Sequence, residues 1–485
     1  MTQDKTLDFV DEPAARRPVM YDMDVAIAGA GLCSTFAAIA AGRCGAKTLL
    51  IERFGILGGN IGPGMITNGG LYNEADTTLP GGLAGIPEEF IERLESLRSR
   101  PVGTYPDESN IASFLAYDMM KAAGVEILFS AHASDPILED GVVKGLFVET
   151  RSGRMAARAK VTVDGTGVAA VARSAGATII PYLEAREEDA DYIRSAYLRK
   201  ESATYYNDTQ LFCVVAGVDV AKFEAFAEEE AELSEDDSEW AESTGTLSSH
   251  PKALIPALRT AWEAEGYRPG CEVGPGIRMT TRPQFRDCGD GVVAFHVTCS
   301  GAVDAGDPRQ TSRIEGILRA QAYKAVKFYR QCAPGFENAC LLTTSSFLGW
   351  RGGPHIEGEH TLTLEESFAG RKCDDVLYRN IHEHNHGGVA SGFDVPYGIV
   401  LPKDIDGLLV CGRGAAYLRR GHDPTGMRAR PSMMIFGQCV GTAAAVAALD
   451  NATPKKLDIK KVQRQLIKDG ICLGDEGRLK ELGLV

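Results

Sequence analysis

The 485-residue sequence is too long for one compact hydrophobic core, so it predicts two domains, or one domain with a large insertion. Its formal net charge of −15 disfavours nucleic acids and anionic membrane surfaces as partners. No stretch approaches the ~20 apolar residues that span a bilayer, and residues 1–20 lack the apolar segment of a signal peptide.

The first predicted unit is a strand, a glycine turn, a helix and a second strand over residues 24–53. "DVAIAGAG" is a short apolar run that ends in glycines, and "LCSTFAAIAAGRCG" spaces small residues as a helix does. "AKTLLIER" is a second buried strand. This order is typical of a parallel sheet in an α/β protein, with a right-handed crossover.

The following segments extend this unit. Residues 54–70 contain too many glycines for a helix or strand and predict an ordered loop, and helical patterns return at 86–99 and 111–124. Residues 125–167 begin with a strand, "VEILFS", and continue with "GVVKGLFVET", "SGRMAARA" and "KVTVDGTG", separated by turn signals. This alternation predicts a β-meander. Residues 168–180 predict a helix of small residues.

The character of the sequence changes beyond residue 180. Residues 222–243 predict an acidic, solvated helix, and residues 307–337 a long amphipathic helix that ends at a Pro-Gly pair. Residues 407–449 predict a strand, a glycine turn, a long loop and a closing helix with Pro431 in its first turn. Small residues recur in that helix at a spacing that permits close packing: Gly437, Gly441 and Ala445.

The glycine turn carries the chemistry of a dinucleotide site. Gly29 permits a sharp turn, and Gly31 lets a pyrophosphate approach the backbone, where N–H groups at the helix N-terminus bind it. Ser34 replaces the third expected glycine, but the following alanines keep the helix slim. Glu52 ends the second strand and can accept hydrogen bonds from a ribose hydroxyl. The alternative is a glycine turn with no ligand.

Five further stretches carry a resemblance to a known family. They are "ERFGILGGNIG", "VTVDGTGVAAVARSAGA", "LGWRGGPHIEGEHTLTLEE", "PYGIVLPKDIDGLLVCGRG" and "RARPSMMIFGQCVGTAAAVA". Together they resemble the FAD-dependent oxidoreductases with the glutathione-reductase-like fold. The resemblance covers most of residues 22–449 and is weakest over 180–270.

The resemblance implies a Rossmann-like FAD-binding domain, with a parallel sheet and a β-meander, built from residues 22–180 and 391–485. A flexible arm, 1–21, precedes it, and an inserted α+β substrate or cap domain spans 181–390. The residues expected to contact FAD are Gly29, Gly31, Ser34, Glu52, Arg53, Gly58, Gly59, Asn60, Ala133, Asp164, Gly165, Thr166, Gly167, Gly412, Arg413, Arg428, Ser432 and Met433.

The closing helix is expected to point its N-terminus at the pyrimidine edge of the flavin. Reduction places negative charge there, and the positive end of a helix dipole stabilises an anion. The alternative is a buried packing helix.

Catalytic candidates follow from departures from the family pattern. The family segment that begins RETR is "RGGPHI" here, which keeps Arg351 and introduces His355, and His422 lies in a longer loop than usual. Histidine can donate or accept a proton near pH 7, so His355 and His422 are candidate acid–base groups beside Arg351. The alternative for each histidine is a hydrogen-bonded structural role.

The arginines of the same segments favour an anionic substrate, since arginine binds carboxylates with two hydrogen bonds. They are Arg351, Arg420, Arg428 and Arg430. The alternative, equally weighted, is that they neutralise the pyrophosphate or pair with acidic residues.

Neither histidines nor cysteines indicate a metal site. "HEHNHGG" at 382–388 has three alternating histidines but no fixed geometry, and it favours a loop that lines the substrate entrance. None of the twelve cysteines lies in a CxxC pair, and five have apolar or small neighbours. This usage indicates reduced thiols in a cytoplasmic protein.

The sequence therefore predicts a cytoplasmic FAD-dependent oxidoreductase that moves a hydride between a small organic substrate and flavin N5. Three alternatives stay open: a redox-neutral flavoenzyme (isomerase, hydratase or lyase), a flavin monooxygenase, and a non-catalytic FAD-dependent interaction protein. The electron donor or acceptor and self-association into a homo-oligomer also stay open.

Overall fold

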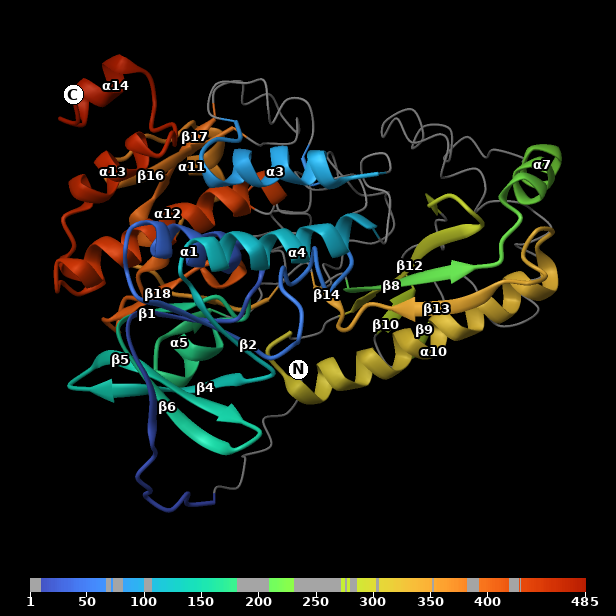
Figure 1. The fold of residues 1–485 in the computed structure, drawn as a ribbon, viewed down its shortest axis with the longest axis horizontal. Coiled ribbons are helices and arrows are strands. Elements are labelled where there is room, and N and C mark those ends of the chain that lie inside the picture. The colour runs from blue at the N-terminus through green and yellow to red at the C-terminus, as the bar shows by residue number, and fades with distance from the viewer. Residues whose placement is uncertain are drawn as a thin grey trace.

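In the computed structural model, the described residues form two seven-stranded sheets, each with its own hydrophobic core, and two small two-stranded sheets (Figure 1). The small sheets pair β15 (His355–Ile356) with β7 (Ile179–Ile180), and β16 (Val376–Asn380) with β17 (Phe393–Pro396). The described residues are 10–66, 71–72, 82–99, 107–180, 209–230, 272–274, 277–279, 286–301, 305–350, 353–381, 392–417, 427 and 429–485.

The first sheet contains the predicted strand–helix–strand unit. It comprises β1 (Val19–Ala28), α1 (Leu32–Arg43) and β2 (Thr48–Glu52). β1 pairs in parallel with β2, β2 pairs in parallel with β3 (Glu126–Phe129), and β6 (Gly153–Asp164) lies between β1 and β18 (Leu408–Val410). Every residue of β2 is buried, which explains its continuous apolar run. The sheet is therefore a parallel, Rossmann-like core.

The β-meander differs in detail from its prediction. It consists of β4 (His132–Glu139), β5 (Val142–Thr150) and β6, paired antiparallel. The expectation of separate segments "SGRMAARA" and "KVTVDGTG" is wrong, because β6 is one continuous strand. One edge of β6 pairs with β1 over residues 156–164. The other edge pairs with β5 over 153–158 and with β18 over 162–164, so one strand joins the meander to the parallel sheet. The helix expected over 168–180 is shorter, α5 (Ala170–Ser174), and precedes β7 (Ile179–Ile180).

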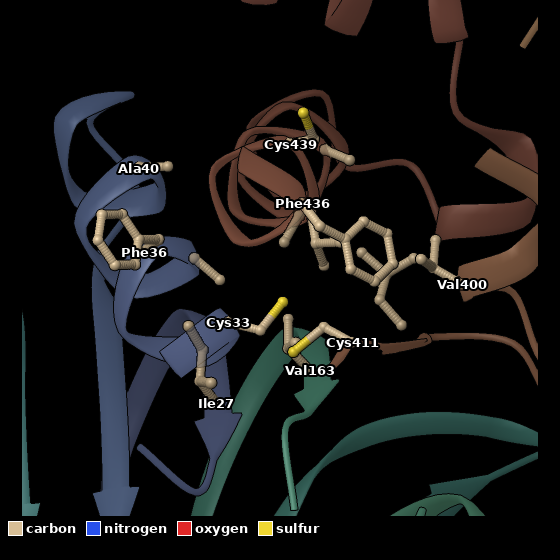
Figure 2. Packing of buried hydrophobic residues seen from close by; sticks show 14 of the residues in the cluster. Ile27, Cys33, Phe36, Ala40, Val163, Val400, Cys411, Phe436 and Cys439 are labelled. Atoms are coloured by element: carbon tan, nitrogen blue, oxygen red, sulfur yellow. The ribbon is translucent and has the colours of Figure 1, made fainter. Parts of the chain in front are cut away.

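Helices α1 and α12 (Arg430–Leu449) cross with their backbones in close contact. A Cβ atom on Gly437 would overlap the carbonyl oxygen of Cys33, and one on Gly441 would overlap that of Ala37. The predicted packing role of these two glycines is confirmed. Figure 2 shows the result: Phe36 on α1 and Phe436 on α12 lie on either side of the contact, with Cys33 and Cys411 beneath it.

The length and composition of α12 bear on the expectation that no stretch is long and apolar enough to span a bilayer. Within the described part of the chain it is the one helix long and apolar enough to cross a membrane, with a mean hydropathy of 1.6. However, 89% of that apolar window is buried inside the protein. Its composition is therefore explained by core packing against α1, β1, β6 and β16 (Val376–Asn380).

The second sheet has the strand order β13-β8-β12-β10-β9. Its strands are β8 (Thr209–Ala216), β9 (Glu272–Gly274), β10 (Ile277–Met279), β11 (Arg286–Asp287), β12 (Val292–Gly301), β13 (Cys340–Thr344) and β14 (Gly349–Trp350). The predicted long helix is α10 (Pro308–Cys332), which Asp307 caps by accepting from the N–H of Arg309. α10 and α7 (Val220–Glu230) pack against this sheet through an aromatic core. The remainder of the acidic stretch expected over 222–243 lies outside the described residues.

Residues 353–381 pack in the first core, which also contains the strand–helix–strand unit. Ile356, Leu362 and Tyr378 are buried in it, although the expected division assigns residues up to 390 to the second domain. This region and the C-terminal part contain α11 (Leu364–Phe368), β15 (His355–Ile356), β16, β17 (Phe393–Pro396), the 3-10 turns η3 (Tyr397–Val400), η4 (Gly412–Gly414) and η5 (Pro454–Lys456), α13 (Ile459–Lys468) and α14 (Glu476–Glu481). The helices α3 (Ile86–Leu97) and α4 (Asp107–Ala122) cover the first sheet beside α1 (Figure 1).

Candidate dinucleotide site

The glycine turn after β1 contains two glycines, Gly29 and Gly31, that differ in backbone conformation and in the space around their Cα atoms. Gly29 has a φ of 85°, and a Cβ there would lie 3.1 Å from the carbonyl oxygen of Gly165, so the protein's own turn requires it. Gly31 has an ordinary φ of −64°, and among the described residues a Cβ would meet only Gly165, at 3.7 Å. The bare backbone at Gly31 is therefore not a demand of internal packing, and it fits the approach of a ligand.

The N-terminus of α1 has the features of a phosphate site. Gly31 is its N-cap residue and provides no side-chain acceptor, and no acidic residue lies in the first turn. The first backbone N–H groups of a helix have no partner within the helix, and the helix dipole makes this end positive. These residues fit a dinucleotide whose pyrophosphate lies at the start of α1.

Glu52 ties the end of β2 to this turn. Its Oε2 accepts from the N–H of Ala30 at 2.6 Å and its Oε1 from the N–H of Phe54 at 2.9 Å, and the residue is 6% exposed. Each carboxylate oxygen can accept a second hydrogen bond, so a ribose hydroxyl can still be bound. Ala133, on β4, follows closely on Ala131, whose N–H donates to the carbonyl of Glu52.

The glycine-rich loop 54–66 packs directly on the turn. The N–H of Gly58 donates to the carbonyl of Ala30 at 3.0 Å, and a Cβ on Gly59 would lie 2.8 Å from the Cα of Gly31. Asn60 accepts from the N–H of Ile66 through its carbonyl and closes the loop. These contacts bring the expected cofactor residues of the loop beside Gly31.

Arg53 lies at the border between the loop and the second sheet. Its guanidinium carbon is 4.7 Å from the centre of the Phe54 ring and 5.9 Å from that of Phe347. The two rings are stacked with centroids 5.4 Å apart, so a cation–π contact joins both parts of the molecule.

Asp164 organises the turn after β6. It is fully buried and accepts from the N–H and hydroxyl of Thr166 and from the N–H of Ala172. Burial raises the pKa of Asp164, and these hydrogen bonds oppose that rise. The N–H of Gly165 donates to the carbonyl of Ala28 at 2.9 Å, which holds this turn against the glycine turn.

Ser34 faces into the protein. Its hydroxyl donates to the carbonyl of Gly165 at 3.5 Å and lies 3.6 Å from Sγ of Cys411, and the residue is 1% exposed. A Cβ on Gly165 would overlap its Oγ. Ser34 thus fills the space between α1 and the end of β6, and its backbone N–H alone is left for a phosphate.

Arg413 connects the first sheet to the second. Gly412 adopts a φ of 64°, and the guanidinium of Arg413 lies over Gly167, with Nη2 3.1 Å from where a Cβ of that glycine would be. Nη1 of Arg413 donates to the carbonyl of Trp350 at the end of β14. The sequence analysis did not single out Trp350 or Phe347, although the aromatic pair in "SSFLGW" was a readable signal.

His355 lies beside this connection. It is 4% exposed, on β15, which pairs with β7 and contacts η4. Its Nδ1 is 2.9 Å from the carbonyl oxygen of Ile356, and a carbonyl can only accept, so Nδ1 carries the hydrogen and Nε2 is the basic nitrogen. The other two catalytic candidates, Arg351 and His422, lie outside the described residues, as do Arg420, Arg428 and the histidines of 382–388.

The start of α12 presents backbone rather than side chains. Ser432 is fully buried and donates to Oδ1 of Asn380 at 2.6 Å, and Met433 is buried beside it. Pro431 occupies the first turn, as predicted, and no acidic residue lies there. The first-turn N–H groups of α12 are therefore the groups that can act on a ligand.

Comparison with known proteins adds one family match. The sequence model described as FAD dependent oxidoreductase matches residues 24–466. No curated protein matches the chain.

Three solved structures illustrate distant similarity. A geranylgeranyl bacteriochlorophyll reductase-like protein from Thermoplasma acidophilum is 15% identical with a TM-score of 0.43, covering 93% of this chain and 84% of that one. p-Nitrophenol 4-monooxygenase from Pseudomonas putida is 10% identical with a TM-score of 0.41, covering 96% and 92%. A flavin-dependent brominase is 12% identical with a TM-score of 0.40, covering 88% and 80%.

Proposed function

We propose a function from the premise that this chain belongs to the family of FAD-dependent oxidoreductases, whose model matches residues 24–466. FAD is its cofactor and the chain is an enzyme. The chemistry that bound FAD supplies here is hydride transfer between a carbon of a small organic substrate and flavin N5. Within the family, the chain has the glutathione-reductase-like fold, and the inserted residues before the return to the first core, which include the second sheet and α10, supply a cap over the substrate.

One observation carries this proposal: three segments distant in sequence converge on the glycine turn and the first turn of α1. Gly58 donates to Ala30, Gly165 donates to Ala28, and the Cβ that Gly412 lacks would lie 3.5 Å from Cβ of Cys33. Such convergence holds one extended ligand. Gly31 and the start of α1 would hold the pyrophosphate of FAD, Glu52 would bind the ribose, and Arg413 would border the ribityl chain.

His355 handles the proton that accompanies the hydride. Its Nδ1 hydrogen bond to Ile356 orients the ring and leaves Nε2 as the nitrogen that accepts a proton. Its burial next to η4 excludes water from that step. Arg351 and His422 stay candidates for binding an anionic group and for the second proton position.

The enzyme is located in the cytoplasm. The eleven cysteines of the described residues form no disulfide, which suits a reducing compartment. Fractionation of cells that express the tagged full chain tests this, and recovery outside the cytoplasmic fraction contradicts it.

Anaerobic bleaching of the yellow flavin band tests the reaction. The holoprotein is mixed with panels of alcohols, amines, sugars and acids, and separately with NADH and NADPH. We expect bleaching by at least one organic donor, and the His355→Gln variant to bleach about a hundredfold more slowly. The exposed His132 gives a matched control, His132→Gln, with an unchanged rate.

Each other outcome contradicts the proposal in a distinct way. Turnover without any electron donor or acceptor indicates a redox-neutral flavoenzyme. NAD(P)H oxidation coupled to incorporation of oxygen indicates a monooxygenase. Bound FAD that no small molecule reduces indicates an interaction protein.

A further inference from the structure

Among the described residues, no helix packs on one face of the second sheet. On β8, Leu211 and Cys213 point into the core that contains α10, so the alternate residues lie on the opposite face. The register of β8 and β12 brings three pairs together there: Val214 with Ala294, Phe212 with His296, and Gln210 with Thr298. We call these six residues the loop-facing side.

The loop-facing side lies against the glycine-rich loop 54–66. Met65 packs on Val214 and Ala294. Gly349 pairs with Gln210, and a Cβ on Gly349 would overlap the side chain of Ile66. The same loop contacts the glycine turn through Gly58 and Gly59, so the loop-facing side adjoins the proposed cofactor site.

Thr298 is the unusual member of this side. It is 5% exposed, and its Oγ1 is buried without a hydrogen-bond partner among the described residues. A buried hydroxyl that lacks a partner costs free energy, and a bound ligand with an acceptor atom can offset that cost.

His296 lies next to Thr298 on the same face of β12, two residues earlier. Its ring stacks on Phe212 with centroids 5.3 Å apart at an interplanar angle of 30°. The stack limits rotation of the half-buried imidazole and orients it on the loop-facing side. A hydroxyl and an imidazole that both donate select an acceptor oxygen.

We infer that Thr298 and His296 bind a carbonyl or carboxylate oxygen of the substrate, and that Phe212 positions His296. This inference rests on the proposed function. It makes the second sheet the part that selects the substrate and assigns two specificity-determining residues outside the family motifs.

The test measures ligand binding and folding stability together. Yellow holoprotein is titrated with benzoate, acetophenone and benzyl alcohol, whose shared ring suits the Phe212–His296 surface, and flavin absorbance reports the dissociation constant. We expect benzoate or acetophenone to bind, and Thr298→Val to raise the dissociation constant about tenfold or more. His296→Gln weakens binding by a smaller factor.

Thermal unfolding provides the second readout. Thr298→Val removes an unpaired hydroxyl at nearly constant shape, so its Tm is expected to rise while binding weakens. A merely structural hydroxyl would not give this opposite pair of effects. The control Thr343→Val changes an exposed residue of the same sheet and is expected to leave the dissociation constant and the Tm unchanged. His132→Gln, at an exposed histidine, is the corresponding control for His296→Gln.

Four results overturn the inference. They are equal dissociation constants for wild type and Thr298→Val, a lower Tm for Thr298→Val, no response of the wild-type flavin to any probe, and binding of benzyl alcohol alone. A protein that binds probes through Thr298 but whose flavin no donor reduces supports this inference and contradicts the proposed function. Donor-reduced flavin with an unchanged KM in Thr298→Val contradicts this inference alone.

Discussion

The first core is closed by backbone against backbone, whereas the second core is filled by aromatic rings. In the first, Gly437 and Gly441 of α12 lie on α1 with no space for a Cβ. In the second, Phe336 makes an edge contact with Phe223 at 5.0 Å and a tilted contact with Tyr329 at 5.3 Å. The contact between α1 and α12 therefore has no space for an added atom, and loss of the Phe336 ring would leave a cavity in the second core.

Two buried polar side chains, one in each unit, differ in their hydrogen bonding. Buried Asp164 in the first unit has its carboxylate filled by three donors of its own chain. Buried Thr298 in the second unit has no partner among the described residues. At these two positions the first unit satisfies its own buried carboxylate, while the second leaves a buried hydroxyl that a ligand can use.

Removing a ring from the second core is the largest predicted effect. Phe336→Ala is expected to lower the free energy of unfolding by ~4 kcal/mol, because a fully buried ring is lost and a cavity remains. Urea unfolding followed by circular dichroism measures it. Phe114→Ala, at a ring that is 57% exposed, is the control and should cost less than ~0.5 kcal/mol. Equal losses in both variants contradict the description of the second core.

The second-largest predicted loss of stability comes from adding a methyl group to the first core. Gly441→Ala is expected to cost ~3 kcal/mol, since the Cβ overlaps the carbonyl oxygen of Ala37 and forces the helices apart. Gly316→Ala in α10 meets nothing within 4 Å and should gain up to ~1 kcal/mol through helix propensity. The same unfolding experiment compares both, and a neutral Gly441→Ala is incompatible with backbone contact between α1 and α12.

The third predicted effect is a loss of FAD affinity when the carboxylate of Glu52 is removed. Glu52→Ala is expected to weaken FAD binding by ~2 kcal/mol, about thirtyfold, because the ribose loses a charged acceptor and Ala30 loses its anchor. Equilibrium dialysis with FAD measures the dissociation constant. Glu126→Ala, at an exposed carboxylate of the neighbouring strand β3, is the control. A Glu52→Ala protein that purifies as yellow as wild type refutes this role.

The smallest effects are two pH dependences of opposite slope. Burial raises the folded-state pKa of Asp164 above 3.8, so the stability it contributes is largest below that pH and declines as pH rises through the raised value. Hydrogen bonding from Lys222 lowers the pKa of Glu337 from 4.5 to about 2, so its contribution is present above 4.5 and is lost as pH falls through about 2.

Unfolding free energies across this pH range test the two slopes. The difference between wild type and Asp164→Asn is expected to shrink as pH rises above 3.8. The difference between wild type and Glu337→Gln is expected to shrink as pH falls from 4.5 toward 2. Two slopes of the same sign would show that the carboxylates of the two units do not differ in this way.

Local patterns explain what could be predicted. The β1–α1–β2 unit, α10 and Pro431 in the first turn of α12 follow from periodicity and end signals within short stretches. The polar alternation "AFHVTC" on β12 was also visible and marks His296 and Thr298 as one face. It does not say whether that face meets solvent, a helix or a ligand.

The sequence by itself determined the elements, the glycine turn and the family, because each depends on neighbours within a few residues of one another. Tertiary structure decided the rest. It joined two predicted segments into β6, placed Ile356 and Tyr378 in the first core, turned Ser34 inward onto Gly165, and set Val214 and Ala294 against Met65 of the glycine-rich loop. Such contacts join residues far apart in the chain, and the pairing of two distant surfaces depends on their shapes, which no local pattern encodes.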